Sequence, residues 1–247
     1  MIEIATILVF AVLQSIFGIG ILFFGTPTLI ILGYPFVETL SIVLPASIAV
    51  SALQVWKGGP PARQWRRDFG IWCLVPLTAF LLAGFWWNWA IELELFIAIT
   101  LFAYVLIRVS PRMRASLQRG VRVRPKIWLS LIGIVHGLSN LGGGLLAIFA
   151  ANTFSDTATI RAHIAFCYLC FAALQLTALA VLAVDVMHIG QLGYAALAGA
   201  VFVILERRFF ETISSPVFDR VFTVLIGGYS ALIFLKLMGL FKVGNSI

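Results

Sequence analysis

The sequence predicts an all-α polytopic membrane protein with about eight transmembrane helices, in two homologous four-helix halves with interrupted helices at glycine-rich motifs. Hydrophobic residues make up 62% of the 247 residues and charged residues 11%, whereas a typical globular domain has roughly 45–50% and about 25%. The mean hydropathy of +1.06 leaves no stretch for a sizeable soluble domain. This composition excludes a disordered chain, a nucleic-acid-binding protein and an ordinary cytosolic enzyme.

Long runs without Asp, Glu, Lys or Arg mark the individual spans. A helix needs roughly 20 apolar residues to cross a bilayer core of about 30 Å. Two weaker candidates, 91–109 and 217–238, open with charges that suit a membrane interface. Together with these, the charge-free runs give eight crossings: 4–37, 39–56, 69–91, 127–155, 162–184 and 186–205.

The net charge of +7 indicates the topology of a membrane protein rather than binding to nucleic acid. Eight crossings place both termini on one side, together with the basic segments 56–68 and 108–126. Of the 17 basic residues, 13 fall on that side, and cytoplasmic loops carry the excess of Lys and Arg. Both termini are therefore predicted to be cytoplasmic, and 108–126 is predicted to be a cytoplasmic loop that touches anionic lipid.

A weak internal repeat divides the chain near its middle. Residues 14–20 align with residues 136–142 at an offset of 122, and residues 52–54 match residues 173–175 at an offset of 121. Two matches at nearly one offset favour a duplicated unit over chance similarity between apolar segments. The predicted organisation is a first transmembrane repeat over 1–109, a basic cytoplasmic linker over 110–126 and a second transmembrane repeat over 127–247.

Glycine and proline interrupt the first span of each half. The runs 4–37 and 127–155 exceed the roughly 20 residues that one crossing needs, so there is room for re-entrant segments, which would change the count and relative orientation of the halves. Interrupted helices at matching positions are typical of transporters built from repeats, whose substrates bind near the bilayer midplane. Because lipid cannot satisfy freed backbone groups, a break must be covered by protein or line a wet cavity. The alternative is that the glycines only permit close helix packing.

The interrupted segments define the candidate binding site. A helix that resumes after a break points its positive N-terminal end into the cavity, which favours an anion. Neutral side chains beside the breaks add hydrogen-bonding groups, and Arg161 either holds an anion or anchors its helix at the headgroups. The candidate substrate-binding residues are Gln14, Ser15, Gly18, Gly20, Thr26, Pro27, His136, Ser139, Asn140, Gly142, Gly143, Gly144 and Arg161.

The two motifs are Gly18-Ile19-Gly20 followed by Pro27, and the run Asn-Leu-Gly-Gly-Gly over 140–144. They resemble the TauE/SafE sulfite exporter family, also called the toluene sulfonate uptake permease superfamily. The resemblance implies a secondary transporter or facilitator that exports a small sulfur-containing anion, such as sulfite, sulfoacetate or a related organosulfonate, across the bacterial inner membrane. The sequence departs from the family pattern because its first half lacks a glycine triplet and its second half lacks the proline after the triplet.

Other patterns leave two alternative functions open. His163, Cys167 and Cys170 share one helix face and could ligate a metal, but no fourth ligand accompanies them, so no metal or other cofactor is expected. An intramembrane enzyme would use His136, His163 and the cysteines, yet the chain has no His-Glu-x-x-His or Gly-x-Ser-x-Gly pattern. An assembly partner that acts by binding alone would not need matched helix breaks.

The expected partners are a small-molecule anion and membrane lipids, with no nucleic acid, and the oligomeric state is open. No Asp or Glu falls in the middle of a predicted span, so a carboxylate proton relay is not expected. The deep titratable candidates are His136 and His163. The chain has no Walker motif, which excludes a built-in ATPase.

Overall fold

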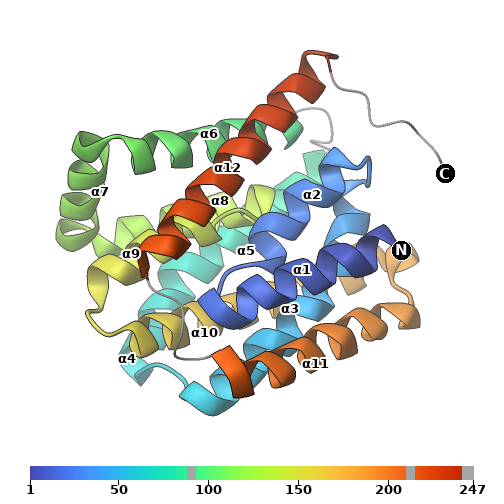
Figure 1. Cartoon of the computed structure of the whole chain (residues 1–247), viewed down its shortest axis with the longest axis horizontal. Coiled ribbons are helices and arrows are strands. Elements are labelled where there is room, and N and C mark those ends of the chain that lie inside the picture. The colour runs from blue at the N-terminus through green and yellow to red at the C-terminus, as the bar shows by residue number, and fades with distance from the viewer. Residues whose placement is uncertain (88–92, 210–214, 241–247) are drawn as a thin grey trace.

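The computed structural model describes residues 1–87, 93–209 and 215–240, without the side chains of residues 87, 206–209 and 215–223. Within these ranges every regular element is a helix, and the long helices form one bundle (Figure 1). Large apolar side chains such as Trp56, Val75 and Ile99 are exposed on the outside of the bundle. The all-α class is confirmed, and an apolar outer surface on many helices is consistent with a membrane protein.

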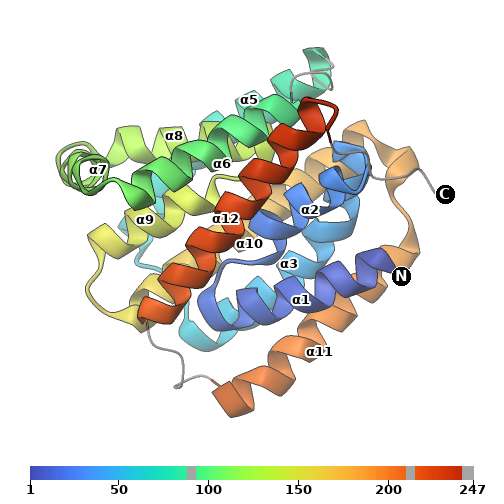
Figure 2. The ribbon, with the colours of Figure 1, turned by 45° about the horizontal axis from the view of Figure 1, so that its top comes forward.

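The chain begins with a helix that breaks and resumes. α1 (Ile2–Phe17) is followed by a π-helical turn (Ile21–Gly25) and by α2 (Thr26–Ile31). The Tyr34 hydroxyl, just after α2, donates a hydrogen bond to Glu3 Oε1 near the start of α1 (2.9 Å). The two ends of this unit therefore lie side by side, and α1 and α2 form a helical hairpin (Figure 2).

The middle of the chain contains the first long helices. Between Arg63 and Trp86 the chain forms one continuous apolar helix that includes a second π-helical turn. The elements are α3 (Phe36–Gly58), α4 (Arg63–Phe69), the π-helical turn Gly70–Leu74, α5 (Val75–Trp87), α6 (Leu93–Val109) and α7 (Pro111–Val123).

Helix α7 corrects the prediction of a loop over 108–126. The chain bends by 101° between α6 and α7. Ser110 caps α7, since its Oγ accepts a hydrogen bond from the Met113 N–H (3.3 Å), and a proline occupies the first helical position. Leu117 and Val121, four residues apart, are buried. The basic segment is therefore an amphipathic helix with its apolar face on the bundle.

The second part of the chain opens with another broken pair, α8 (Pro125–Ser139) and α9 (Gly143–Thr153). α9 packs against α7, which directly precedes α8, so this pair also turns back on itself (Figure 1). Two short 3-10 turns, Val184–Val186 and Ile189–Gln191, connect α10 to α11. The last three helices are α10 (Thr157–Leu182), α11 (Leu192–Phe209) and α12 (Ser215–Leu237).

Asp156 fixes the start of α10, the longest helix. Its carboxylate accepts hydrogen bonds from the N–H groups of Ala158 (3.2 Å) and Thr159 (2.7 Å). Hydrogen bonds from the Thr159 side chain and from these two N–H groups lower the pKa of Asp156 from its ordinary value. The acidic cap also suits the positive end of the helix dipole.

Helices from the two parts of the chain pair with one another. α3 packs against α10 and α11, α5 packs against α8, α1 packs against α11, and α12 packs against α6. Figures 1 and 2 both show α12 crossing the bundle over α2 and α6. Leu44 and Val50 of α3 and Phe171 and Leu179 of α10 are completely buried in the resulting core.

A lysine ties three of these helices together. Lys236 on α12 donates to Glu94 Oε1 on α6 (2.9 Å) and to the Ile30 carbonyl near the end of α2 (2.8 Å). The ammonium group therefore neutralises a carboxylate and satisfies a terminal helix carbonyl at the same time.

Among the described residues, three helices are long and apolar enough to cross a membrane, and the bent pair α6 and α7 makes a fourth when counted as one span. The predicted spans 4–37 and 127–155 each consist of two shorter helices. The count of eight crossings and the division into two halves stay predictions. The long helices are Phe36–Gly58, Arg63–Trp86 and Thr157–Leu182.

Candidate functional site

Gln14 closes the first helix break. Gly18 ends α1 in the left-handed conformation, with φ of 76°, and its N–H donates to the Gln14 carbonyl (2.8 Å). The chain resumes its helix at Ile21, whose N–H donates to Gln14 Oε1 (3.1 Å). The Gln14 amide nitrogen lies 3.1 Å from the Ser47 hydroxyl and 3.0 Å from the Ser51 hydroxyl on α3. Both polar ends of this buried side chain therefore have partners.

The second break follows the same backbone course with fewer side-chain partners. Asn140 ends α8 with φ of 62°, and its N–H donates to the His136 carbonyl (2.8 Å). Left-handed conformations are unusual outside glycine, and asparagine tolerates them best. The Leu141 carbonyl accepts a hydrogen bond from the Tyr104 hydroxyl (2.8 Å). Among the described residues no side chain caps α9, which starts at Gly143.

Two glycines make equivalent close contacts at the two breaks. A Cβ at Gly20 would clash with the Phe10 carbonyl oxygen, and a Cβ at Gly142 would lie 2.6 Å from the Ile132 carbonyl oxygen. Phe10 and Ile132 are 122 positions apart, as are the two glycines. The offset seen in the sequence therefore also relates the contacts, and the prediction that these motifs interrupt helices is confirmed.

The two breaks meet inside the bundle. Asn140 Nδ2 donates to Thr26 Oγ1 (2.8 Å), and both residues are completely buried. The rings of Phe23, beside the first break, and Tyr104, beside the second, have centroids 5.7 Å apart. Two segments more than 100 positions apart in the sequence therefore share one interior region.

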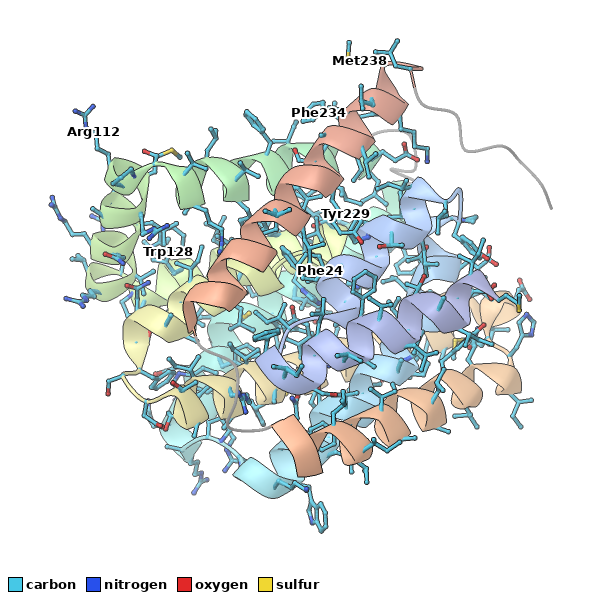
Figure 3. The ribbon with its side chains drawn as sticks, viewed as in Figure 1. Phe24, Arg112, Trp128, Tyr229, Phe234 and Met238 are labelled. Carbon is cyan, nitrogen blue, oxygen red and sulfur yellow. The ribbon has the colours of Figure 1, made fainter. Side chains whose placement is uncertain are left out.

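Helix α12 covers the first break. Figure 3 shows Tyr229 of α12 beside Phe24 of the π-helical turn, and their ring centroids are 5.9 Å apart. The Tyr229 and Thr28 hydroxyls lie 2.7 Å apart in a hydrogen bond. Through Tyr229, α12 therefore packs directly on the α1–α2 hairpin.

A cluster of four buried polar side chains lies at the second break. Within the described part of the chain, both ring nitrogens of His136, Asn140 Oδ1, the Tyr168 hydroxyl and both amide atoms of Gln175 have no hydrogen-bond partner. The Phe171 ring stacks on His136 at 4.1 Å between centroids, and the Tyr168 ring lies edge-on at 6.3 Å. The Gln175 amide lies beside the imidazole without completing a hydrogen bond. Because unpaired buried polar groups are unfavourable, this His136 cluster is suited to meeting a polar ligand.

The His136 cluster lies at the N-terminus of α9. A Cβ at Gly143 would coincide with the Tyr168 hydroxyl, so this hydroxyl lies directly against the first turn. α9 has 11 residues, and the N-terminal end of its dipole favours negative charge. Among residues whose burial is described, no Asp, Glu, Lys or Arg is fully buried. The described side chains of this cluster are therefore neutral and polar, and they lie beside the positive end of a helix dipole.

Several predicted site residues have a local role in the structure. The Ser15 hydroxyl donates to the Ala11 carbonyl (2.6 Å) and the Ser139 hydroxyl to the Val135 carbonyl (2.8 Å), each within its own helix. Pro27 lies in the first turn of α2. These three residues shape the ends of the broken helices.

Arg161 contacts the first break, whereas Gly144 lies where the two breaks meet, beside Tyr104 and Phe23. The Arg161 Cγ lies 3.6 Å from the position of a Cβ at Gly18, so the arginine stem contacts the first break. A Cβ at Gly144 would lie 2.8 Å from the Tyr104 ring. The structure brings Gly143, His136 and Asn140 together at the second break and leaves Arg161 with the first.

The histidine and cysteines of the metal alternative do not form a ligand set. His163 Nδ1 lies 2.8 Å from the Thr159 carbonyl oxygen, and its ring packs against Phe154 and Trp65, with centroids 3.9 Å and 4.7 Å away. In the part of the chain that the structure describes, no group of three or more His, Cys, Asp or Glu could hold a metal ion.

Sequence reasoning missed two members of the His136 cluster, Tyr168 and Gln175. Both lie on α10, far from the glycine motifs in sequence. A signal for Gln175 was present, because it aligns with Gln54 in the internal repeat. Gln54 contacts the first break, where its amide nitrogen donates to the Gln14 carbonyl (3.0 Å).

Broken helices that meet inside an apolar bundle, with unpaired polar groups where they meet, are typical of one class of protein: membrane transporters built on interrupted helices. The chain matches the family model for the sulfite exporter TauE/SafE over residues 3–233. It belongs to the TauE/SafE family, as its motifs predicted. No curated protein and no solved structure matches the chain.

Proposed function

We propose that this protein is a secondary transporter or facilitator that exports a small sulfur-containing anion across the bacterial inner membrane. Sulfite, sulfoacetate and related organosulfonates are the substrate class. The observation that carries this proposal is the His136 cluster of unpartnered polar atoms at the N-terminus of α9. Membership of the TauE/SafE family supports the same class of substrate.

A sulfonate group suits the chemistry of this cluster. Its three oxygens share one negative charge and accept several hydrogen bonds at once. The Tyr168 hydroxyl and the Gln175 amide can donate from α10, while the first turn of α9 directs its N–H groups and dipole at the same region. Because these groups are neutral, they stabilise an anion without holding it as tightly as a fixed cation would. Moderate affinity favours release on the far side.

The helix packing supports two homologous halves, 1–109 and 127–247, joined by the linker 110–126 that contains α7. Under the 122-residue offset, α3 corresponds to α10 and α6 to α12, and each of these pairs is in contact. The contact of α1 with α11 has its counterpart in the contact of α8 with α5. A pseudo-two-fold axis between the halves is expected to give both kinds of contact: a helix packed against its own counterpart, and a pair of contacts that are counterparts of each other.

The two hairpins favour a different crossing count from the eight-span prediction. If α1–α2 and α8–α9 are both re-entrant, the remaining crossings are α3, α4–α5, α6, α10, α11 and α12. Three crossings in each half give the halves opposite orientations in the membrane. Inverted repeats with broken helices at the midplane are a common design of secondary transporters.

This crossing count also reverses the orientation predicted from the sequence. The linker helix α7 then lies on the side opposite to both termini. Of the 17 basic residues, all except Lys236 and Lys242 fall on the α7 side, a stronger asymmetry than eight crossings give. By the positive-inside rule, α7 is cytoplasmic and both termini lie outside.

Two single-cysteine variants separate the two orientations. In a background with Cys73, Cys167 and Cys170 replaced by alanine, Ile2→Cys and Ser116→Cys each introduce an exposed thiol. Re-entrant hairpins predict that an impermeant thiol reagent labels only Ile2→Cys in intact cells. Eight crossings predict that both sites are protected. The cysteine-free parent controls for background labelling.

Flux in proteoliposomes tests the function. Labelled sulfite and methanesulfonate should move saturably and chemically unchanged, and both should raise the thermal unfolding midpoint of the purified protein while choline does not. An intramembrane enzyme would return a modified sulfur compound, and an assembly partner would give no flux. Equal stabilisation by choline would reject the anion assignment.

A further inference from the structure

We infer that His136 couples transport to protons: it takes up a proton when the anion binds, so that the protein carries anion and proton together. This inference rests on the proposed transport function and deepens it. The proton comes from a hydronium ion on the side where the anion enters, is held on a ring nitrogen of His136, and leaves with the anion on the other side. Export then runs down the outward concentration gradient of the anion itself. On entry an O–H bond of the hydronium ion breaks as the N–H bond on His136 forms, and on release the N–H bond breaks as an O–H bond forms in water.

The burial of His136 is the first observation. The side chain is completely buried, and neither ring nitrogen has a hydrogen-bond partner among the described residues. A lone imidazolium in an apolar interior is strongly unfavourable, so the ring is neutral while no anion is present. An adjacent sulfonate reverses this balance, because the two charges then form a compensated pair.

The described contacts of His136 are with neutral side chains, namely the rings of Phe171 and Tyr168 and the Gln175 amide. The buried titratable side chains on the helices packed around it are hydroxyls and thiols. The charged residue of α8, Lys126, stands at its start, about 15 Å along the helix from His136. On α6 the carboxylate of Glu94 is paired with Lys236, and on α10 Arg161 contacts the first break. The hydroxyls and thiols belong to Tyr104 on α6, Tyr168 and Cys167 on α10, and Cys73 in the π-helical turn before α5.

The position of His136 links the proton to the anion. His136 lies on α8 directly before the break, and its Cβ lies 2.6 Å from the position of a Cβ at Gly142. Tyr168, whose hydroxyl lies against Gly143, is in edge-on contact with the His136 ring. An anion held by the first turn of α9 and by this hydroxyl is therefore also a neighbour of the imidazole.

Calorimetry on the purified full chain tests the coupling directly. Methanesulfonate is the probe, because its own charge does not change between mildly acidic and mildly alkaline pH. Titrations in buffers of different ionisation enthalpy should show uptake of about one proton per bound anion, and the affinity should weaken about tenfold per pH unit as pH rises through the range in which free His136 is neutral and bound His136 is charged. Binding without proton uptake and with a pH-independent affinity would overturn the inference.

Two matched variants locate the proton. His136→Gln keeps a planar polar side chain but cannot be protonated, so it should bind methanesulfonate without proton uptake and without the pH dependence. His163→Gln, on α10 and away from the cluster, should behave like the parent protein. A folded His136→Gln variant that still takes up a proton overturns the assignment. If His136→Gln does not fold, the double variant His163→Gln/His188→Gln decides instead, because it leaves His136 as the one histidine in the chain. Proton uptake that persists in this variant supports the assignment, and its loss overturns it.

Proteoliposomes connect the binding result to transport. An inward proton gradient should drive methanesulfonate accumulation, with matching acidification reported by a trapped pH dye. One proton per monovalent anion is electroneutral, so an imposed potassium diffusion potential should leave the rate unchanged. A rate that follows the potential, with no dye signal, overturns proton coupling but leaves the transport function intact. Absence of anion binding and of flux overturns both.

Discussion

The two helix breaks share a backbone course and differ in how their side chains are satisfied. Gln14 and His136 occupy equivalent places, since the carbonyl of each accepts the N–H of the left-handed residue that ends its helix. The Gln14 side chain bonds the resuming helix and the serines of α3. The His136 side chain bonds nothing among the described residues. Gln14 therefore satisfies polar groups at its own break, whereas the side chain of His136 leaves its polar atoms unpaired there.

The residues around these two positions differ in the same sense. Tyr168 stands where the 121-residue offset aligns Ser47, and it faces His136 without a hydrogen bond. Gly143 stands where the 122-residue offset aligns Ile21, whose large side chain is buried at the first break. A helix break inside an apolar bundle can thus be closed by the protein or reserved for a ligand. We therefore propose a structural role for the first break and a binding role for the second.

The largest expected effect is the loss of transport in Gly143→Leu. Any side chain at this position displaces the Tyr168 hydroxyl and covers the N-terminus of α9. We expect no saturable anion flux, with the protein still inserted and monodisperse. Gly84→Leu is the matched control, since a Cβ there meets nothing within 4 Å. Normal flux in Gly143→Leu would mean that the glycines serve packing alone.

The next effect should be the same at both breaks. Gly20→Ala and Gly142→Ala each push a Cβ onto a backbone carbonyl oxygen that cannot move freely. We expect each change to lower the free energy of unfolding by about 1–3 kcal/mol, measured by thermal or denaturant unfolding in detergent. If only one of the two changes lowers the free energy of unfolding, the two breaks do not have equivalent packing.

Gln14→Leu tests the structural role of the first break. It leaves the Ile21 N–H and the Ser47 and Ser51 hydroxyls without their buried partner, which should destabilise the protein by about 1–3 kcal/mol. Affinity for methanesulfonate in the folded fraction should not change. Gln64→Leu, at an exposed position in α4, should leave the stability near that of the parent.

The smallest effect should come from Tyr168→Phe, with the opposite signature. The hydroxyl has no partner in the described residues, so its removal should leave stability unchanged or slightly raised. Anion affinity should fall by about 1 kcal/mol, or about fivefold, because one donor to the ligand is lost. Tyr229→Phe is the counterpart, since it loses the hydrogen bond to Thr28 and should reduce stability without reducing affinity.

The glycine pattern predicted where the helices break, because a positive φ at Gly18 and the close carbonyl contacts of Gly20 and Gly142 are local requirements. It could not predict Tyr168, whose contact with Gly143 exists only once α10 packs against α9. The basic residues of 108–126 suggested a loop. The sequence nevertheless contains a helix N-terminal signal there, since Ser110 is followed directly by a proline.

The number of membrane crossings is harder to predict from the sequence than the helix breaks are, because it depends on the direction of the chain after each break. An apolar run of 34 residues fits one long interrupted span or a hairpin equally well by length. The hydrogen bond between Tyr34 and Glu3 is a contact between the two ends of that run. Neither composition nor periodicity encodes such a contact, because it follows from the tertiary fold.

The Lys236 contacts have a mechanical consequence for the first hairpin. Asn140 holds Thr26 at one end of α2, and Lys236 holds the Ile30 carbonyl near the other. This helix has only six residues and is hydrogen-bonded to other helices at both ends. Moving α2 relative to the bundle must therefore either break these hydrogen bonds or move Lys236 on α12 and its partner Glu94 on α6 with it.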